Sequence, residues 1–180
     1  FAFFVERPYA VTANPDATPK AIFVSAFDSN PLAANFEYVL QGQEKDFQTG
    51  LDALAKIAKT HLGICVCQKN PALTSAKNVT VTAFEGANPA GNVGVQINHI
   101  DPINKGEIVW TLGAEEVIFI GRLFNTGHVD FTRTIALTGS EVKAPAYTKL
   151  MVGAALKNVF AGRVNNSEPV RYINGNPLTG

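Results

Sequence analysis

Hydrophobic residues follow two periodicities along this chain, and each periodicity predicts a different element. Three uninterrupted apolar runs predict strands buried on both faces of a sheet: residues 21–27 ("AIFVSAF"), 61–67 ("HLGICVC") and 78–84 ("NVTVTAF"). Residues 43–59 instead carry apolar side chains at helical spacing, in one stripe: Phe47, Leu51, Leu54 and Ile57. The order of strand, helix and strand predicts a parallel sheet with crossover connections.

The segment 107–127, "EIVWTLGAEEVIFIGRLFNTG", predicts a short strand that leads into a helix. Glu115 and Glu116 suit the positive first turn of that helix, and Gly127 suits its C-terminal cap. Apolar residues surround most of the helix: Val117, Ile118, Phe119, Ile120, Leu123 and Phe124. We therefore expect this helix to be buried against the sheet.

The pattern changes after Gly127. Short strands separated by glycines are predicted in "TRTIALTG", "YTKLMVG" and "RVNN…VRYING", with one short helix at 154–161 that Gly162 ends. Before the first buried strand, residues 1–20 contain three prolines and mostly small or polar side chains. The predicted organisation is a loop-like lead-in at 1–20, a Rossmann-like, partly parallel α/β domain at 21–127, and a small α+β module of β-grasp type at 128–180.

Charge and composition exclude several classes of partner. The 180 residues contain 15 basic and 15 acidic side chains, so no net charge attracts nucleic acid or an anionic lipid surface. No apolar run approaches the roughly 20 residues that span a bilayer. The chain begins at Phe1 without a signal pattern, which predicts a piece of a longer protein.

The only two cysteines, Cys65 and Cys67, form a C-x-C pair. A continuous strand would place both on one face, where an extended C-x-C does not bridge comfortably. We therefore predict buried free thiols, which suit a reducing, cytoplasmic compartment.

The segment "NPAGNVG" has glycines three residues apart, Gly91 and Gly94, between a predicted strand and a predicted helix at 92–99. A dinucleotide fingerprint needs a third glycine and an acidic residue about 20 positions later, which Glu115 or Glu116 matches only loosely. The favoured interpretation is a turn into a helix, with a phosphate-binding loop as the alternative.

"SAFDSNP" follows the carboxyl end of the first buried strand, where open α/β sheets build ligand crevices. Asp28, Ser29 and Asn30 would then face a ligand. The same residue types are common in ordinary turns, and the two interpretations are weighed equally.

Other catalytic chemistry has little support. The three histidines show no zinc-ligand spacing, and His99 and Asp101 are two residues apart, so a helix points them to different sides. No serine lies in a nucleophile elbow or an S-x-x-K pair. We therefore predict no catalytic residue and no metal ligand in the chain.

Four strings together resemble one family: "TPKAIFVSAFDSNPLAA", "NPAGNVGVQINHIDPIN", "VWTLGAEEVIFIGRLFNTG" and "GSEVKAPAYTKLMVGAAL". They look like the A subunit of the bacterial sodium-translocating NADH:quinone reductase, and they occur in that subunit's order. The chain would correspond to the middle of a subunit more than twice as long. More distantly it is similar to the flavin-binding subunit of complex I and to the C subunit of the Rnf complex.

The resemblance implies a peripheral subunit on the cytoplasmic side of the bacterial inner membrane. Its partners would be the membrane and peripheral subunits of the same complex, with ubiquinone or menaquinone near by. It would contribute assembly and help to shape the quinone region. The alternative is a self-sufficient oxidoreductase domain that binds flavin or nicotinamide.

The resemblance also implies no redox cofactor in this chain, with flavins and iron–sulfur centres held by partner subunits. The acidic loop that holds flavin in the complex I relative reads "SAFDSNP" here, and two cysteines are too few for an iron–sulfur cluster. The remaining candidates for a ligand or for the quinone region are Asp28, Asn30, Gly91, Gly94 and His99. In the second module, a small-ligand site would use Lys143, Tyr147, Lys149 and Arg163, although an exposed sheet face is polar in any case.

Overall fold

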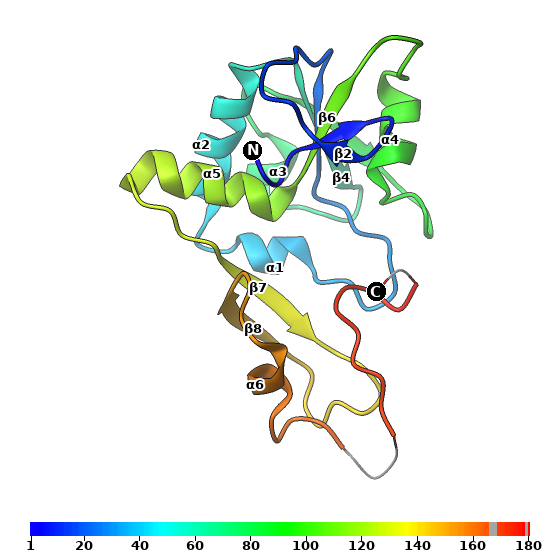
Figure 1. Cartoon of the computed structure of the whole chain (residues 1–180), viewed down its shortest axis with the longest axis vertical. Helices are drawn as coiled ribbons and strands as arrows, with labels where there is room; N and C mark the ends of the chain where they lie inside the picture. Colours follow the sequence, from blue (N-terminus) through cyan, green and yellow to red (C-terminus); the bar gives the residue numbers. More distant parts are fainter. Residues whose placement is uncertain (166–168, 179) are drawn as a thin grey trace. The chain divides into compact units, whose positions relative to one another are not determined.

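The computed structural model describes residues 1–165, 169–178 and 180 in two compact units (Figure 1). The first unit combines Phe1–Ser29 with Phe36–Asp130, and the second combines Asn30–Asn35 with Phe131–Gly180. The predicted strand "RVNN" runs into residues 166–168, which lie outside the described residues. The fold is an α/β unit with a largely parallel sheet, followed by a smaller unit with an antiparallel sheet.

From residue 21 onward, the first unit contains the predicted strands and helices in the predicted order. Its elements are β1 (Val5–Arg7), β2 (Val11–Thr12), β3 (Ile22–Ser25), α1 (Phe36–Leu40), α2 (Glu44–Ala55), β4 (Thr60–Cys65), α3 (Pro71–Thr74), β5 (Thr80–Phe84), α4 (Val93–Ile100), β6 (Val109–Gly113) and α5 (Ala114–Thr126). The predicted strands and the three longer helices are confirmed. Gly127 ends α5 with a φ of 74°, the left-handed cap that glycine adopts most easily.

The six strands lie in the order β2-β1-β6-β3-β4-β5. The strands β6, β3, β4 and β5 are parallel, whereas β1 is antiparallel to β6 and to β2. The chain moves outward from β3 through β4 to β5 and then returns to the other side of β3 as β6. This reversal places the topological switch point at the carboxyl ends of β3 and β6.

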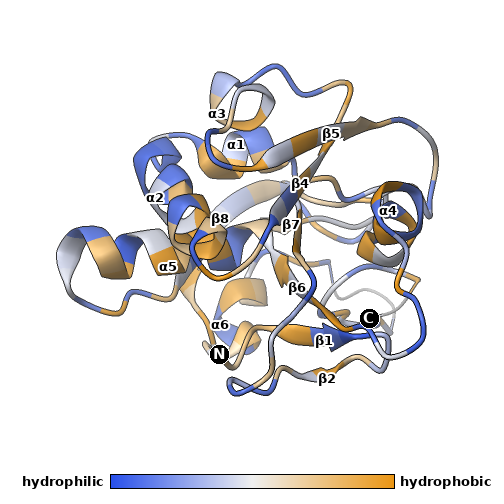
Figure 2. Ribbon diagram, turned by 90° about the horizontal axis from the view of Figure 1, so that it is seen from above, coloured by the Kyte–Doolittle hydropathy of each residue, from blue (hydrophilic) through white to orange (hydrophobic). Residues whose placement is uncertain are grey.

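The two faces of the sheet carry cores of different size. A large cluster on one face joins the strands to α2, α3 and α5, and it includes the fully buried Phe47, Leu51 and Trp110. The smaller cluster on the opposite face contains Phe23 and Ile97 from β3 and α4. Figure 1 shows α2 and α5 on one side of the sheet and α4 on the other. Figure 2 shows hydrophobic residues along β6 and hydrophilic residues on the outer turns of α2.

Helices α2 and α5 approach each other through glycines. A Cβ on Gly121 would overlap the backbone carbonyl of Asp46, and a Cβ on Gly50 would overlap that of Val117. Asn125 adds a hydrogen bond from its Nδ2 to the Asp46 carboxylate, at 2.6 Å. The space that a side chain would take at each glycine is thus filled by the backbone of the other helix, which allows closer contact than alanine would permit.

Three expectations about the first unit were wrong. Residues 1–20 are not all loop, because β1 extends the sheet by antiparallel pairing with β6, and β2 pairs antiparallel with β1. The helix predicted at 43–59 ends at Ala55, and Ile57 is 49% exposed. The last turn of α5 is not buried, since Phe124 is 67% exposed. The first error concerns strands that form by pairing with a distant part of the chain, and the other two concern the ends of helices.

The second unit is built on a two-stranded antiparallel sheet of β7 (Thr132–Leu137) and β8 (Ala146–Met151), followed by α6 (Leu156–Phe160). The helix is shorter than the predicted 154–161. "VRYING" forms no strand among its described residues, and an isolated bridge joins Val142 to Val164. The short segment Asn30–Asn35 belongs to this unit, and the Asn35 amide donates to the Tyr147 hydroxyl at 2.9 Å.

Candidate functional site

The carboxyl edge of the parallel sheet in the first unit is where an α/β fold of this topology would hold a ligand. The loops that follow β3 and β4 begin there, as do the loop between β5 and α4 and helix α5, which follows β6 directly. A ligand at this edge would need free backbone amides or polar side chains directed at a common point.

Gly91 lies in the loop before α4 and packs against the loop after β3. Its amide donates to Ser29 Oγ at 2.8 Å, and its carbonyl accepts from Ser25 Oγ at 3.4 Å. A Cβ at this position would lie 2.8 Å from the carbonyl oxygen of Phe27 and would overlap the Ser29 amide. The glycine is therefore explained by the close approach of two backbone segments.

Gly94 and His99 lie on the exposed part of α4. No heavy atom lies within 4 Å of a Cβ added to Gly94, so packing does not require glycine there. The His99 Nδ1 is 2.8 Å from the Val95 carbonyl, one helical turn back along α4. His99 therefore contacts its own helix, whereas Gly91 contacts the loop after β3, and the two do not converge on one point.

The structure divides the remaining candidates between the two units. Asp28 is exposed in the loop after β3 in the first unit, whereas Asn30 begins the segment that belongs to the second unit. The predicted set therefore does not form a site within a single unit.

The N-terminus of α5 faces the switch point, where the helix dipole would favour an anion. Gly113 precedes the helix without a side-chain cap, and the Glu116 carboxylate folds back over the Gly113 Cα, overlapping the position of a Cβ. A negative charge of the protein thus already lies at the start of α5, where it would oppose the binding of a phosphate. The sequence predicted the acidic first turn of α5, and the structure shows that one of its carboxylates lies over Gly113.

The turn after β4 is closed by a buried glutamine. Gln68 is 8% exposed; its Oε1 accepts from the Cys65 amide at 2.9 Å, and its Nε2 donates to the Ala26 carbonyl at 2.8 Å. The Val66 amide donates to the Phe84 carbonyl at 3.0 Å. These backbone groups at the ends of β3, β4 and β5 are therefore bound to protein groups.

The prediction of free thiols at Cys65 and Cys67 was wrong, because the two sulfurs form a disulfide. Strand β4 ends at Cys65, and the chain turns at Val66, so the two cysteines do not lie in one extended strand. The turn brings their Cα atoms to 5.1 Å, within the range that a disulfide needs. Cys65 is buried and Cys67 is exposed.

A buried histidine beneath α4 was not singled out by the sequence. His61 in β4 is 2% exposed and stacks on Phe23, with ring centroids 4.8 Å apart and planes 14° apart. Neither ring nitrogen has a hydrogen-bond partner among the described residues. Burial lowers the pKa of His61 below its usual value; the charge of Lys59 acts in the same direction, and Asp101 opposes it. The sequence signal for a buried histidine was the position of His61 at the start of the apolar run 61–67.

A second buried polar group, Gln96 of α4, points down onto the same face. It is 1% exposed, and its side chain fills the space above Gly63 of β4, where a Cβ would overlap the amide. Its Nε2 is 3.5 Å from the Gly91 carbonyl. Gln96 therefore connects α4 to the strand and to the preceding loop.

Lys20 forms ion pairs at the C-terminal end of α4. Its ammonium lies 2.6 Å from the Asp101 carboxylate and 2.9 Å from that of Glu107. The hydrogen bonds to Asp101 and Glu107 raise the pKa of Lys20. The amide of Asn104, followed by Lys20, lowers the pKa of Glu107. These ion pairs connect the C-terminal end of α4 to the loop that leads into β6.

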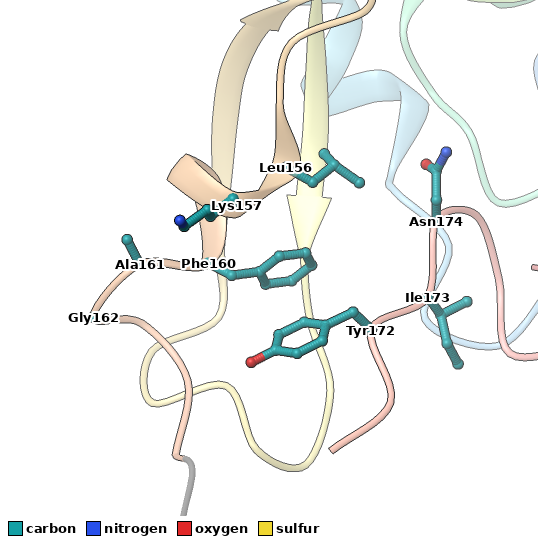
Figure 3. A pocket seen from close by; sticks show the side chains of 8 residues that line it. All are labelled: Leu156, Lys157, Phe160, Ala161, Gly162, Tyr172, Ile173 and Asn174. Carbon is teal, nitrogen blue, oxygen red and sulfur yellow. The ribbon is translucent and has the colours of Figure 1, made fainter. Parts of the chain in front are cut away.

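The second unit contains a cavity of about 480 Å³ beside α6. Phe160 and Tyr172 form one wall, with ring centroids 4.7 Å apart. Figure 3 shows the Lys157 ammonium pointing away from this ring pair. The polar lining residues Lys157, Tyr172 and Asn174 are all exposed, so none of them is a buried polar group directed at a ligand.

The polar residues proposed from the sequence for a small-ligand site in the second unit contact their neighbours instead. Lys143 donates to the Gly162 carbonyl at 3.3 Å, and Arg163 donates to Thr148 Oγ1 at 3.0 Å. Within residues 1–165, 169–178 and 180, no group of three or more His, Cys, Asp or Glu is arranged to hold a metal ion. No helix among the same residues is both long and apolar enough to span a bilayer.

Comparison with known proteins identifies both units. A family described as the NqrA second alpha/beta domain matches residues 1–129, and one described as the NQRA C-terminal domain matches residues 134–180. The chain is 37% identical over 175 residues to the A subunits of the Na(+)-translocating NADH-quinone reductases of Saccharophagus degradans and Hahella chejuensis, covering 97% of this chain. The corresponding A subunit of Actinobacillus pleuropneumoniae serotype 5b is 37% identical over 181 residues, covering 98% of this chain.

The chain spans 39–40% of the length of these relatives. The two matched families nevertheless cover both units, in the order in which they occur along the chain. The chain therefore belongs to the NqrA family, the A subunits of Na(+)-translocating NADH-quinone reductases.

Proposed function

We propose that this chain is part of an A subunit that assembles with the other subunits of a Na(+)-translocating NADH-quinone reductase and holds no redox centre of its own. Flavins and iron–sulfur centres would be held by the partner subunits. The chain would lie peripherally on the cytoplasmic side of the membrane and contribute to the shape of the quinone region. Membership of the NqrA family supports the assembly with that complex.

One observation carries the proposal that no nucleotide or flavin is held here. At the carboxyl edge of the sheet, two loop amides that could bind a phosphate are already bonded within the protein. The Gly91 amide is bound to Ser29, and the Cys65 amide is bound to Gln68. The Glu116 carboxylate covers the start of α5, where its charge would repel a phosphate. The residues present thus do not fit a flavin phosphate at this edge.

The test is cofactor binding by the purified chain. We expect no flavin absorbance after purification and no saturable heat when FMN or NADH is titrated by calorimetry. A dissociation constant for NADH below about 1 mM, which corresponds to roughly 4 kcal/mol, would instead favour the alternative of a self-sufficient oxidoreductase.

Two glutamate variants separate charge from geometry at this edge. Glu116→Gln removes the carboxylate over α5, and Glu44→Gln makes the same change in the first turn of α2. Neither variant should bind NADH, because the Gly91 and Cys65 amides remain bonded to Ser29 and Gln68. NADH binding by Glu116→Gln alone would reveal a nucleotide site blocked only by charge and would contradict the proposal.

The exposed part of α4 is the second element of the proposal. Gly94 has open space around it and His99 is exposed, so both are accessible to a quinone or to a neighbouring protein of the complex. Asp28, Asn30 and Gly91 remain candidate contacts from the loops after β3 and before α4. In the assembled complex, Gly94→Ala and His99→Ala should raise the KM for quinone, with the exposed Lys56→Ala at the C-terminal cap of α2 as the control. Unchanged quinone kinetics in both variants would remove α4 from the quinone region.

A further inference from the structure

The turn that carries the disulfide is held by hydrogen bonds and presents its two sulfurs unequally. Gln68 fixes the Cys65 amide, the Gln68 amide donates to the Cys65 carbonyl at 3.0 Å, and the Val66 amide is tied to β5. Cys65 is 9% exposed at the end of β4, whereas Cys67 is exposed on the turn. A molecule in solution therefore reaches the disulfide from the side of Cys67.

We propose that Cys65 and Cys67 form a reversible dithiol–disulfide site that exchanges with low-molecular-weight thiols of the glutathione class, with Cys67 as the entry sulfur. Disulfides in a reducing compartment are usually transient, catalytic or redox-sensing and seldom permanent braces. The reversibility of the disulfide therefore rests on the cytoplasmic location that is part of the proposed function. The order of reaction of the two sulfurs rests only on the geometry of the turn.

Two contacts in the turn would stabilise Cys65 as the departing thiolate. The Cys67 amide donates to Cys65 Sγ at 3.2 Å, and a hydrogen bond to the charged form of an acid favours that form. The Lys69 ammonium donates to the Val66 carbonyl at 3.3 Å, which places a positive charge in the same turn. The acidic residue that contacts this turn, Glu37, is bonded to the amides of Lys69 and Asn70.

The exchange balances in two steps. A thiolate RS⁻ attacks Cys67 Sγ, the Cys65–Cys67 bond breaks, and Cys65 leaves as a thiolate, so that Cys67 carries a mixed disulfide with R. A second RS⁻ attacks the sulfur of R, which releases RSSR and the Cys67 thiolate, and the two protein thiolates take up protons. The protein disulfide is thereby reduced and two RSH are oxidised to RSSR. The reverse reaction, with oxidised glutathione as the oxidant, restores the disulfide.

Single serine variants distinguish the two sulfurs. The purified chain, Cys65→Ser and Cys67→Ser are each incubated with oxidised glutathione, and the adduct is followed by intact mass. Cys65→Ser should accumulate one glutathione on Cys67, because the thiol that would release it is gone. Cys67→Ser should react at least about tenfold more slowly, since its remaining thiol is buried. With maleimide added under denaturing conditions, the unmodified oxidised chain should take up no maleimide and the reduced chain two.

Two results would overturn the inference. One is an unmodified chain that still takes up two maleimides after equilibration in a buffer rich in oxidised glutathione. The other is equal rates of glutathione addition in the two serine variants. Circular dichroism checks that the variants fold, and Cys65→Ala replaces Cys65→Ser if the buried hydroxyl prevents folding. A flavin bound to the chain would overturn the proposed function without changing any of these mass measurements.

Discussion

The two faces of the six-stranded sheet are built in contrasting ways. The face covered by α2, α3 and α5 is apolar and closely packed, with glycines that bring two helices into backbone contact. The face beneath α4 has a small apolar cluster and carries polar groups: His61, Gln96 and the ion pairs of Lys20. The first face therefore supplies most of the stability of the unit. The second face adjoins the loop before α4, which carries Gly91.

The largest expected effect is on the closely packed face. Gly121→Ala should lower the free energy of unfolding by about 3 kcal/mol or more, because its Cβ would collide with the Asp46 backbone, which has no side-chain freedom to yield. The measurement is urea unfolding followed by the fluorescence of Trp110, the single tryptophan, which lies in the first unit.

Gly94→Ala on α4 is the matched control for that substitution. The added methyl group meets no atom within 4 Å, and alanine favours helix, so this variant should be more stable by up to about 1 kcal/mol. Equal losses in the two variants would show that the two faces do not differ as described.

An intermediate effect is expected at the loop contact of Gly91. Gly91→Ala should cost about 1–3 kcal/mol, because loop backbone yields to a collision more easily than two packed helices do. Ser29→Ala, which removes only the acceptor of the Gly91 amide, should cost about 1 kcal/mol in the same urea titration. A larger loss in Ser29→Ala than in Gly91→Ala would show that the hydrogen bond, and not the close approach, holds the two loops together.

A smaller effect follows from His61, and it depends on pH. The pKa of His61 is lowered in the folded state, so the unfolded chain binds the proton more readily. The stability associated with neutral His61 is therefore fully present above the unfolded pKa of about 6.5 and is lost as the pH falls below it. His61→Leu should remove this dependence between pH 7 and pH 5 and change stability at pH 7 by less than about 1 kcal/mol. An unchanged pH profile in the variant would show that His61 does not titrate in this window.

The smallest effect is expected for Lys20→Met. Lys20 and its two carboxylate partners lie near the surface, where salt screens ion pairs. The urea midpoint of the variant should fall below that of the unmodified chain at low salt, and the difference should disappear in about 1 M NaCl. A difference that persists at high salt would mean that the aliphatic part of Lys20, and not its charge, holds the end of α4.

The strands and helices that pack in the centre of the first unit were predictable from the sequence. Buried parallel strands are continuous apolar runs, and α2 shows its stripe through Phe47, Leu51 and Leu54, all of which are buried. The edge strands β1 and β2 were not predictable, because β1 forms by pairing with β6, about a hundred residues later in the chain, and β2 pairs with β1. Local propensity carries no information about such a partner.

The candidate site, too, was only partly predictable from the sequence. The acidic first turn of α5 was predicted, but only the structure shows that the Glu116 carboxylate folds back over Gly113. The sequence could not separate the roles of Gly91 and Gly94, since one is fixed by a backbone contact at long range and the other has open space. The disulfide was missed because the end of β4 at Cys65 depends on Gln68 and on the pairing with β5.

The assignment of Asn30–Asn35 to the second unit has a practical consequence for dissecting this protein. The chain passes from one unit to the other three times, after Ser29, after Asn35 and after Asp130, so a single cut cannot release either unit whole. A truncation after Asp130 would leave residues 30–35 without Tyr147, the residue that accepts the amide of Asn35. Separate expression of the two units therefore requires two changes. A short loop would replace residues 30–35 in the first unit, and the segment 30–35 would be joined to the second unit.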